Sequence, residues 1–326
     1  MRFAILEVVE GARASIYWKA IQEIAVFQTP FMGKPCLLAV LGTVALTGLT
    51  GCFSSVRRVE QVQTVSAPLQ TANVGELEAR ISARDAVIKT LNASVMITAS
   101  TGGGKEGEVK TYTSFRGYIF VRKPGDLRVI MQLPVIGGEA MDMVSDGHSF
   151  KMLIPPQKRA IVGSNEVTKP SKNALENLRP AVFLDSLLVP GVAADEFVSL
   201  TESSRIVEPA HGRKAAISEP DYDVEVFRVI HGHVLQQRRV IHISRVTLLP
   251  YQQDIFDNEG RVVTQATYAN YQPIGTEQFP RLVTIKRPLD ELSLTIQVTK
   301  LMLNETFDAD QFELKIPANV PVTRME

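Results

Sequence analysis

Leu292-Ser293-Leu294-Thr295-Ile296-Gln297-Val298-Thr299 alternates apolar and polar side chains along its whole length. Successive side chains of a β-strand point to opposite faces of the sheet. The stretch therefore predicts a strand within residues 291–303 that has one apolar face and one wet face. This pattern is typical of an antiparallel sheet that packs one face on a core.

Strand patterns recur through most of the chain. In the second half they are predicted over residues 224–230, 234–244, 246–257, 261–271 and 281–287. In the first half they are predicted over residues 94–100, 112–121, 127–133, 139–144, 148–154 and 158–163, with a short strand at 197–200. The connections are short, which indicates an antiparallel meander. One of them, Lys123-Pro124-Gly125-Asp126, is predicted to be a type II turn.

Two helical segments interrupt the strands. Asn73 and Glu76 have the spacing of a capping box at the start of the first helix. Apolar residues then recur at helical spacing, at Leu77, Ile81, Ile88 and Leu91. Arg84 falls on the same stripe, where it either lines a polar point of a cavity or extends its charged end to the edge. The second helix is predicted from Ser171 to Leu188, and Pro180 either kinks it or divides it into two short helices.

These elements predict an α+β chain that is mainly antiparallel β, with about 11–12 strands. A sheet of this size curls, so the apolar faces of its strands surround a concavity that the helices cover as a lid. The concavity is either a lipid-sized pocket or a core filled by side chains, and the pattern leaves both open. The residues expected to line it are Leu77, Ile81, Arg84, Ile88, Phe115, Ile119, Leu292, Leu294 and Ile296.

The N-terminal region has the pattern of a secretory signal. Lys34 precedes an apolar run over residues 37–49, which ends in Leu49-Thr50-Gly51-Cys52. The run is shorter than the roughly 20 residues that span a bilayer, which disfavours a transmembrane helix with an incidental cysteine. We therefore expect a signal peptide over 1–51, a flexible tether over 52–72 and a single folded domain over 73–326. Met32 is the expected start of translation, and a long N-terminal extension is the alternative.

Composition and motifs favour a chain without catalysis. The formal net charge is zero, so nothing suggests a nucleic-acid partner. The two cysteines are Cys36, in the signal, and Cys52, which leaves the folded domain without a disulfide or thiolate chemistry. No nucleophile-elbow, zinc-helix or phosphate-loop motif is present. His231-Gly232-His233 offers two imidazoles without a third ligand nearby, so we predict no metal or cofactor.

Several stretches resemble one family. The hairpin Phe115-Arg116-Gly117-Tyr118-Ile119-Phe120-Val121-Arg122-Lys123-Pro124-Gly125-Asp126-Leu127-Arg128 resembles the second and third strands of LolA-type lipoprotein carriers. Leu133-Pro134-Val135-Ile136-Gly137-Gly138 is similar to the loop of the lipid-anchored LolB-type receptors. Leu49-Thr50-Gly51-Cys52 resembles the lipobox of bacterial lipoprotein precursors. The resemblance covers about 75–317, although 165–221 is longer and less regular than in the family.

The resemblance implies an unclosed β-barrel with a helical lid, which binds acyl chains of lipoproteins or lipids without catalysis. Cys52 would carry acyl chains such as palmitate and anchor the protein to the outer membrane, facing the periplasm. Phe53 is not aspartate, which under the enteric sorting rule implies the outer membrane. A periplasmic carrier protein is a possible partner, and the chain is expected to be a monomer.

The resemblance also gives the loop residues Val135 and Ile136 a role, which is contact with the membrane during lipid delivery. The alternative is that both fold inward as core. For the whole chain, the alternative function is a structural or sensory envelope lipoprotein that uses the fold as a protein-binding module.

Overall fold

The computed structural model describes residues 63–64, 67–103, 107–135, 137–165, 179–207 and 217–325 of the 326-residue chain. The chain divides into two compact units, and the described residues belong to the second, Gln61–Glu326. The predicted signal peptide, its lipobox and Cys52 lie outside the described residues. Within the described part, no helix is long and apolar enough to cross a bilayer.

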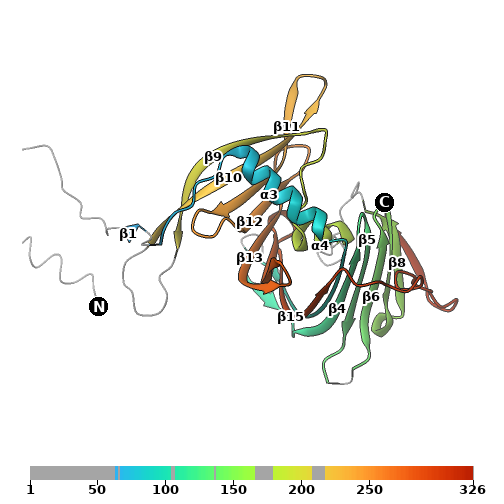
Figure 1. The fold of residues 1–326 in the computed structure, drawn as a ribbon. Coiled ribbons are helices and arrows are strands. Elements are labelled where there is room, and N and C mark those ends of the chain that lie inside the picture. Colours follow the sequence, from blue (N-terminus) through green and yellow to red (C-terminus); the bar gives the residue numbers. More distant parts are fainter. Residues whose placement is uncertain are drawn as a thin grey trace, which may run out of the picture. The chain divides into compact units, whose positions relative to one another are not determined.

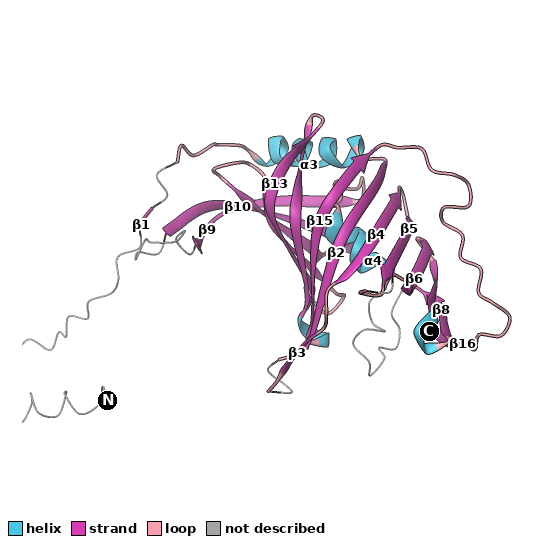
Figure 2. Ribbon diagram, turned by 90° about the horizontal axis from the view of Figure 1, so that it is seen from below, coloured by secondary structure: helices cyan, strands magenta, loops and turns pink. Residues whose placement is uncertain are grey.

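The described residues form one sheet of sixteen strands with two α-helices (Figures 1 and 2). The helices are α3 (Val74–Val87) and α4 (Pro180–Leu187). The strands of the first half are β1 (Gln63–Thr64), β2 (Thr90–Gly102), β3 (Val109–Thr111), β4 (Phe115–Arg122), β5 (Asp126–Gln132), β6 (Glu139–Asp146), β7 (Ser149–Ile154) and β8 (Arg159–Ser164). The remaining strands are β9 (Glu196–Val207), β10 (Ile217–Ile230), β11 (Val234–Ser244), β12 (Pro250–Phe256), β13 (Val262–Ile274), β14 (Glu277–Arg287), β15 (Leu292–Leu303) and β16 (Val322–Met325).

The sheet consists of two antiparallel meanders that meet at one pair of strands. One meander runs from β2 through β4 to β8, and the other from β9 through β10 to β15. β15 pairs with β2 and joins them, while β9 and β16 lie at the two ends and do not pair with each other. The sheet is therefore unclosed, as the sequence predicts, and the fold class is confirmed.

The alternating stretch of β15 lies at this joint. Leu292, Leu294 and Ile296 are buried, whereas the polar residues between them are more exposed. Leu294 and Ile296 of β15 pair with Ala99 and Ile97 of β2, respectively. Apolar side chains from both meanders therefore lie on the same face of the sheet. The predicted wet and dry faces of this strand are confirmed.

The sheet has more strands than the 11–12 predicted. Three short strands, β1, β3 and β16, have no local pattern of their own and exist because a neighbouring strand offers an edge. The predicted short strand at 197–200 is the twelve-residue β9, since it pairs along β10 from Glu196–Arg228 to Val207–Ile217. The existence and length of these strands depend on pairing with partners distant in the sequence, which the propensity of a single segment does not predict.

The predicted type II turn after β4 is wrong. A type II turn needs a positive φ at its third residue, and Gly125 does not have one. The glycine has a different reason: a Cβ there would lie 2.8 Å from the Cα of Gly147, in the neighbouring β6–β7 turn. Close approach of two turns therefore requires glycine at both positions.

The first helix begins as predicted. Asn73 Oδ1 accepts a hydrogen bond from the Glu76 backbone N–H, and the Glu76 carboxylate accepts one from the Asn73 backbone N–H. Leu77 and Ile81 of α3 are buried against β10 and β11, in a cluster with Tyr222. Of the predicted second helix, Pro180–Leu187 is described; Pro180 occupies its first turn, where a missing N–H is tolerated.

The segment between β15 and β16, residues 304–321, crosses the outer face of β4–β8 (Figure 1, dark red). Phe307 packs edge-on against Phe120 with centroids 5.9 Å apart, and against Phe312 at 5.5 Å. These ring contacts hold the segment against the sheet. Arg128 fixes the segment, since its Nη1 donates to the Gln311 carbonyl at 3.0 Å.

Arg128 also forms a bidentate pair with the buried Asp142, at 2.7 and 3.1 Å. We expect Asp142→Ala to lower the free energy of unfolding by about 3 kcal/mol, because it strands a largely buried guanidinium. Asp126→Ala is the matched control: its pair with Arg122 spans 2.8 Å but is more exposed, which predicts a loss of about 1 kcal/mol or less. Urea unfolding measures both, and equal losses would contradict the account.

Candidate functional site

An apolar cavity of about 260 Å³ lies between the inner face of the first meander and α4. We call it the methionine cavity, because four of the nine methionines of the chain line it. Its walls are Ile97, Ala99, Tyr112, Phe115, Met131, Ala140, Met141, Met143, Met152, Ile154, Gln157, Ile161, Phe183 and Leu294.

Strand register brings the methionines together. Met131 of β5 pairs with Met141 of β6, and Met143 pairs with Met152 of β7. The register between β5 and β6 then shifts, so that Gln132 pairs with Glu139 and leaves Ala140 as an extra residue. Such a bulge bends the strand and re-aims side chains, which explains why Ala140 and Met141 both reach the cavity.

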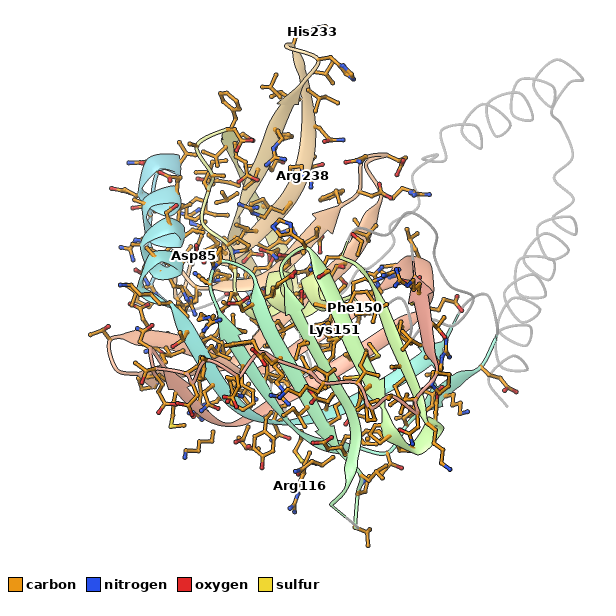
Figure 3. All side chains as sticks on the ribbon, turned by 90° about the vertical axis from the view of Figure 1, so that its right-hand side faces the viewer. Asp85, Arg116, Phe150, Lys151, His233 and Arg238 are labelled. Atoms are coloured by element: carbon orange, nitrogen blue, oxygen red, sulfur yellow. The ribbon has the colours of Figure 1, made fainter. Side chains whose placement is uncertain are left out.

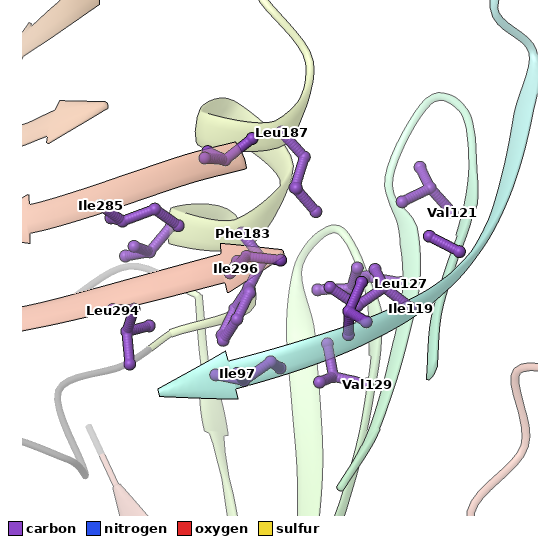
Figure 4. Packing of buried hydrophobic residues seen from close by; sticks show 14 of the residues in the cluster. Ile97, Ile119, Val121, Leu127, Val129, Phe183, Leu187, Ile285, Leu294 and Ile296 are labelled. Carbon is purple, nitrogen blue, oxygen red and sulfur yellow. The ribbon is translucent and has the colours of Figure 1, made fainter. Parts of the chain in front are cut away.

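The helix α4 forms the inner wall of the cavity. Phe183 is buried in the main core and points from α4 toward the strands of Ile296 and Ile97 (Figure 4). Val182 and Leu187 of the same helix are also buried in this core. The sequence leaves open whether the concavity is a pocket or a filled core. In the structure it is filled in part, because α4 occupies one region and the methionine cavity lies beside it.

The cavity opens at one rim of the sheet. Its lining residues Ile97, Met143 and Ile161 are fully buried, whereas Met131 and Gln157 are partly or fully exposed. The exposed lining residues lie next to the described parts of three connections, which are 103 with 107–114, 133–135 with 137–138, and 155–158. We call these connections the loop rim, and the exposure of their neighbours places the mouth of the cavity there.

Val135 projects from the same rim. Its relative exposure is 104%, and its φ is +73°, in the left-handed region. A β-branched residue rarely adopts this conformation, so the tip combines an exposed apolar side chain with backbone strain. Arg116, which pairs with Gln132 at the base of the loop, lies on the side of the sheet away from His233 (Figure 3). Ile136 lies outside the described residues.

A second hollow, the α3 groove, has a volume of about 290 Å³ and a more polar lining. It runs between α3 and the connections near residues 244–250 and 274–278, and Arg80, Arg84 and Glu277 line it. Arg84 donates to the Gln278 carbonyl and lies 5.4 Å from the centroid of the Tyr271 ring. It therefore holds α3 on the β13–β14 hairpin.

The predicted lining residues separate into several places. Phe115 and Leu294 line the methionine cavity, while Leu77, Ile81 and Arg84 line the α3 groove. Ile88 lines a small hollow of about 20 Å³, which shares Arg84 and Val189 with the α3 groove. Ile119 and Ile296 are fully buried core residues, and Leu292 is buried without lining any of these hollows.

Sequence reasoning missed the methionines. Met131, Met141, Met143 and Met152 fall within one short stretch of the chain, which is the signal that could have found them. Methionine is flexible and polarizable, so it suits a surface that adapts to an apolar ligand.

A polar cluster lies on the outer face of β10–β12. His242 Nδ1 is 2.7 Å from Asp223 Oδ1, and its Nε2 is 3.4 Å from Asp254 Oδ2. Burial lowers the pKa of His242, but the two carboxylates outweigh it and the net shift is upward. Burial alone would raise the pKa of Asp254. Hydrogen bonds, first of all the one from His242, outweigh burial, so the pKa of Asp254 is lowered.

This cluster resembles no metal centre, since no group of three or more ligating side chains in the described part of the chain could hold an ion. His231 and His233 are exposed at the tip of the β10–β11 hairpin and do not belong to this cluster. The cluster therefore has a structural role in joining three strands, and the methionine cavity is the better candidate site.

Solved structures of similar fold come from bacteria. A LolA superfamily protein from Nitrosomonas europaea is 13% identical over 74% of this chain and 96% of its own, with a TM-score of 0.45. A DUF1329 family protein from Desulfovibrio piger is 15% identical over 74% and 95%, at 0.47. A putative outer membrane lipoprotein-sorting protein domain from Vibrio parahaemolyticus is 13% identical over 74% and 97%, at 0.42.

At such identities and TM-scores the likeness concerns the fold alone. No family model matches the chain, and no curated protein matches it.

The raised pKa of His242 predicts a pH dependence of stability. Protonated His242 contributes to the free energy of unfolding. This contribution is fully present below the pKa of histidine in the unfolded chain, about 6.5. It is lost as pH rises through the raised pKa of the folded state. The difference in unfolding free energy between the wild type and His242→Gln should therefore shrink from pH 6 to pH 9. His233→Gln, at the exposed hairpin tip, is the control and should show little change in unfolding free energy because it replaces an exposed surface side chain. A His242→Gln difference that is constant with pH would contradict the assignment.

The strained tip predicts a stabilising substitution. Val135→Asn should raise the free energy of unfolding by up to about 1 kcal/mol, because asparagine tolerates a positive φ better than valine. Val109→Asn, at an exposed position of β3, should lower it, because asparagine disfavours strands. Thermal unfolding measures both variants, and destabilisation by Val135→Asn would show that the tip packs against something.

Proposed function

We propose that the chain is a lipid-anchored carrier or receptor that binds an acyl chain of a lipid or lipoprotein in the methionine cavity, without catalysis. One observation carries the proposal: an apolar cavity opens at the same rim from which a fully exposed, strained valine projects. A ligand leaving this mouth would enter whatever surface Val135 touches.

The tip has the properties of a membrane contact. An exposed apolar side chain in a strained conformation has no role in stabilising the fold, so it favours an external partner. Val135 lies four residues after Met131 of the cavity wall, which keeps the contact and the mouth together. Ile136 would extend the same apolar tip.

The anchor completes the proposal. Cys52 would carry the lipid. The predicted tether over 52–72 is shortened at its C-terminal end, because β1 pairs with β10 and the Gln70 backbone N–H donates to the Arg245 carbonyl. The ten residues 53–62 that remain would reach roughly 35 Å when extended. The proposed location is the outer membrane, facing the periplasm, where a periplasmic carrier would deliver the cargo.

A second candidate function is a protein-binding envelope lipoprotein without a carrier role. It is favoured by exposed apolar residues on the second meander, Phe197 of β9 at 55% and Leu235 of β11 at 58%. In this case α4 would simply complete a core, and a partner protein would cover these side chains.

Transfer of a fluorescent acyl lipid from the protein to vesicles tests the proposal. Val135→Glu should slow transfer about tenfold, since losing the burial of one valine removes roughly 1.5 kcal/mol or more. Binding of the lipid and thermal stability should be retained, because the side chain touches neither core nor cavity wall.

Val234→Glu is the matched control, an exposed valine at the β10–β11 hairpin, and should leave the transfer rate unchanged. Equal slowing by both variants would indicate a general charge effect. A wild type that binds no lipid would move the account to the protein-binding module.

A further inference from the structure

We propose that the methionine cavity takes a single-chain anionic amphiphile, one acyl chain whose carboxylate or similar head stays at the mouth beside Tyr112 and Lys110. The inference rests on the proposed function and names the ligand class of the same cavity. It separates a ligand with one chain from the multiply acylated end of a lipoprotein.

The size of the cavity favours one chain. A methylene has about the volume of a water molecule, roughly 30 Å³, so a chain of 10–16 carbons needs about 300–500 Å³ and three chains about 900–1,400 Å³. The cavity measures about 260 Å³. It accommodates the inner part of one chain and leaves the rest of that chain in the mouth.

The walls place the head of the ligand at the mouth. No charged side chain lines the cavity, and its two polar side chains, Tyr112 and Gln157, are partly or fully exposed. An ionised head would lose its hydration without compensation if it entered further. The buried end, at Ile97, Met143 and Ile161, therefore receives the hydrocarbon end.

A cation lies beside this mouth. Lys110 and Tyr112 are two residues apart and point to the same face, and the Lys110 ammonium lies 5.1 Å from the centroid of the Tyr112 ring. The Tyr112 hydroxyl lies 3.4 Å from Thr101 Oγ1. Lys110 is exposed, so its ammonium can meet a carboxylate held near the tyrosine hydroxyl.

Carboxylates also lie near this rim: Glu108 precedes Lys110 by two residues, and Glu139 precedes Ala140 of the cavity wall. Glu291 precedes β15, and its carboxylate lies near Gly103 at the end of β2. β15 pairs with one edge of β2, whereas β3, with Lys110, pairs with the other edge. Lys110 is the basic group that contacts Tyr112, a polar residue of the mouth.

Titration calorimetry on the compact unit Gln61–Glu326, prepared without detergent, tests the inference. The probes are dodecanoate, dodecanol and a phosphatidylcholine with two eight-carbon chains, each below its micelle concentration. We expect one dodecanoate per protein, weaker binding of dodecanol, and still weaker binding of the two-chain lipid, because only one of its chains fits the cavity.

Variants assign the two ends of the ligand. Lys110→Gln should weaken dodecanoate about tenfold and leave dodecanol unchanged, whereas Lys151→Gln, an exposed lysine on β7 (Figure 3), should change neither. Ala140→Trp should fill the cavity and abolish the binding of dodecanoate and dodecanol. Met131→Trp replaces it as the test variant if Ala140→Trp lowers the melting temperature.

Each other outcome overturns the inference. Binding of the two-chain lipid without dodecanoate would reject the single-chain ligand and keep the proposed function. Equal binding of dodecanoate and dodecanol, unaffected by Lys110→Gln, would reject the anionic head. Binding that persists in both tryptophan variants would place the ligand elsewhere, and no binding of any probe would reject the inference together with the proposed function.

Discussion

The pairing of β15 with β2 is the contact on which the rest of the structure depends. It joins two meanders that are otherwise separate runs of sequence, through a ladder from Leu292–Thr101 to Leu303–Leu91. Without it, each meander would expose its own apolar face along one edge. With it, the first and second meanders share one inner face, and the sheet curls around α4.

The cavity follows from what α4 does not fill. Phe183 and Leu187 occupy the concavity near the joint, and the region toward the loop rim is lined by methionines instead of further helix. At about 24 cal/mol per Å³, an enclosed void of about 260 Å³ would cost ~6 kcal/mol of stability. Water entering through the open mouth lowers this cost, and an acyl chain would remove it. The architecture thus gains stability from the ligand class that we propose it binds.

Sequence predicts the local features of this molecule well. The alternation of Leu292, Leu294 and Ile296 and the capping box at Asn73 each depend on residues close together in the sequence, and both are confirmed. The sequence also predicts which face of each strand is apolar. It does not predict which residues of that face line the cavity and which are packed in the core. Phe115 and Ile119 are both core-facing residues of β4, yet only Phe115 reaches the cavity, because the position of α4 decides where filling stops. The length of β9 and the short strands β3 and β16 depend on partners distant in sequence, and no local pattern carries that information.

The central claim is that the methionine cavity holds an acyl chain. Native mass spectrometry of Gln61–Glu326, purified gently from a host that supplies lipids, tests it most directly. The account predicts added mass that resolves to acyl species on denaturation for the wild type, and a clean mass for Ala140→Trp of equal thermal stability. A clean wild-type mass that stays unchanged after incubation with membranes would contradict the claim, as would the same acyl species on both proteins.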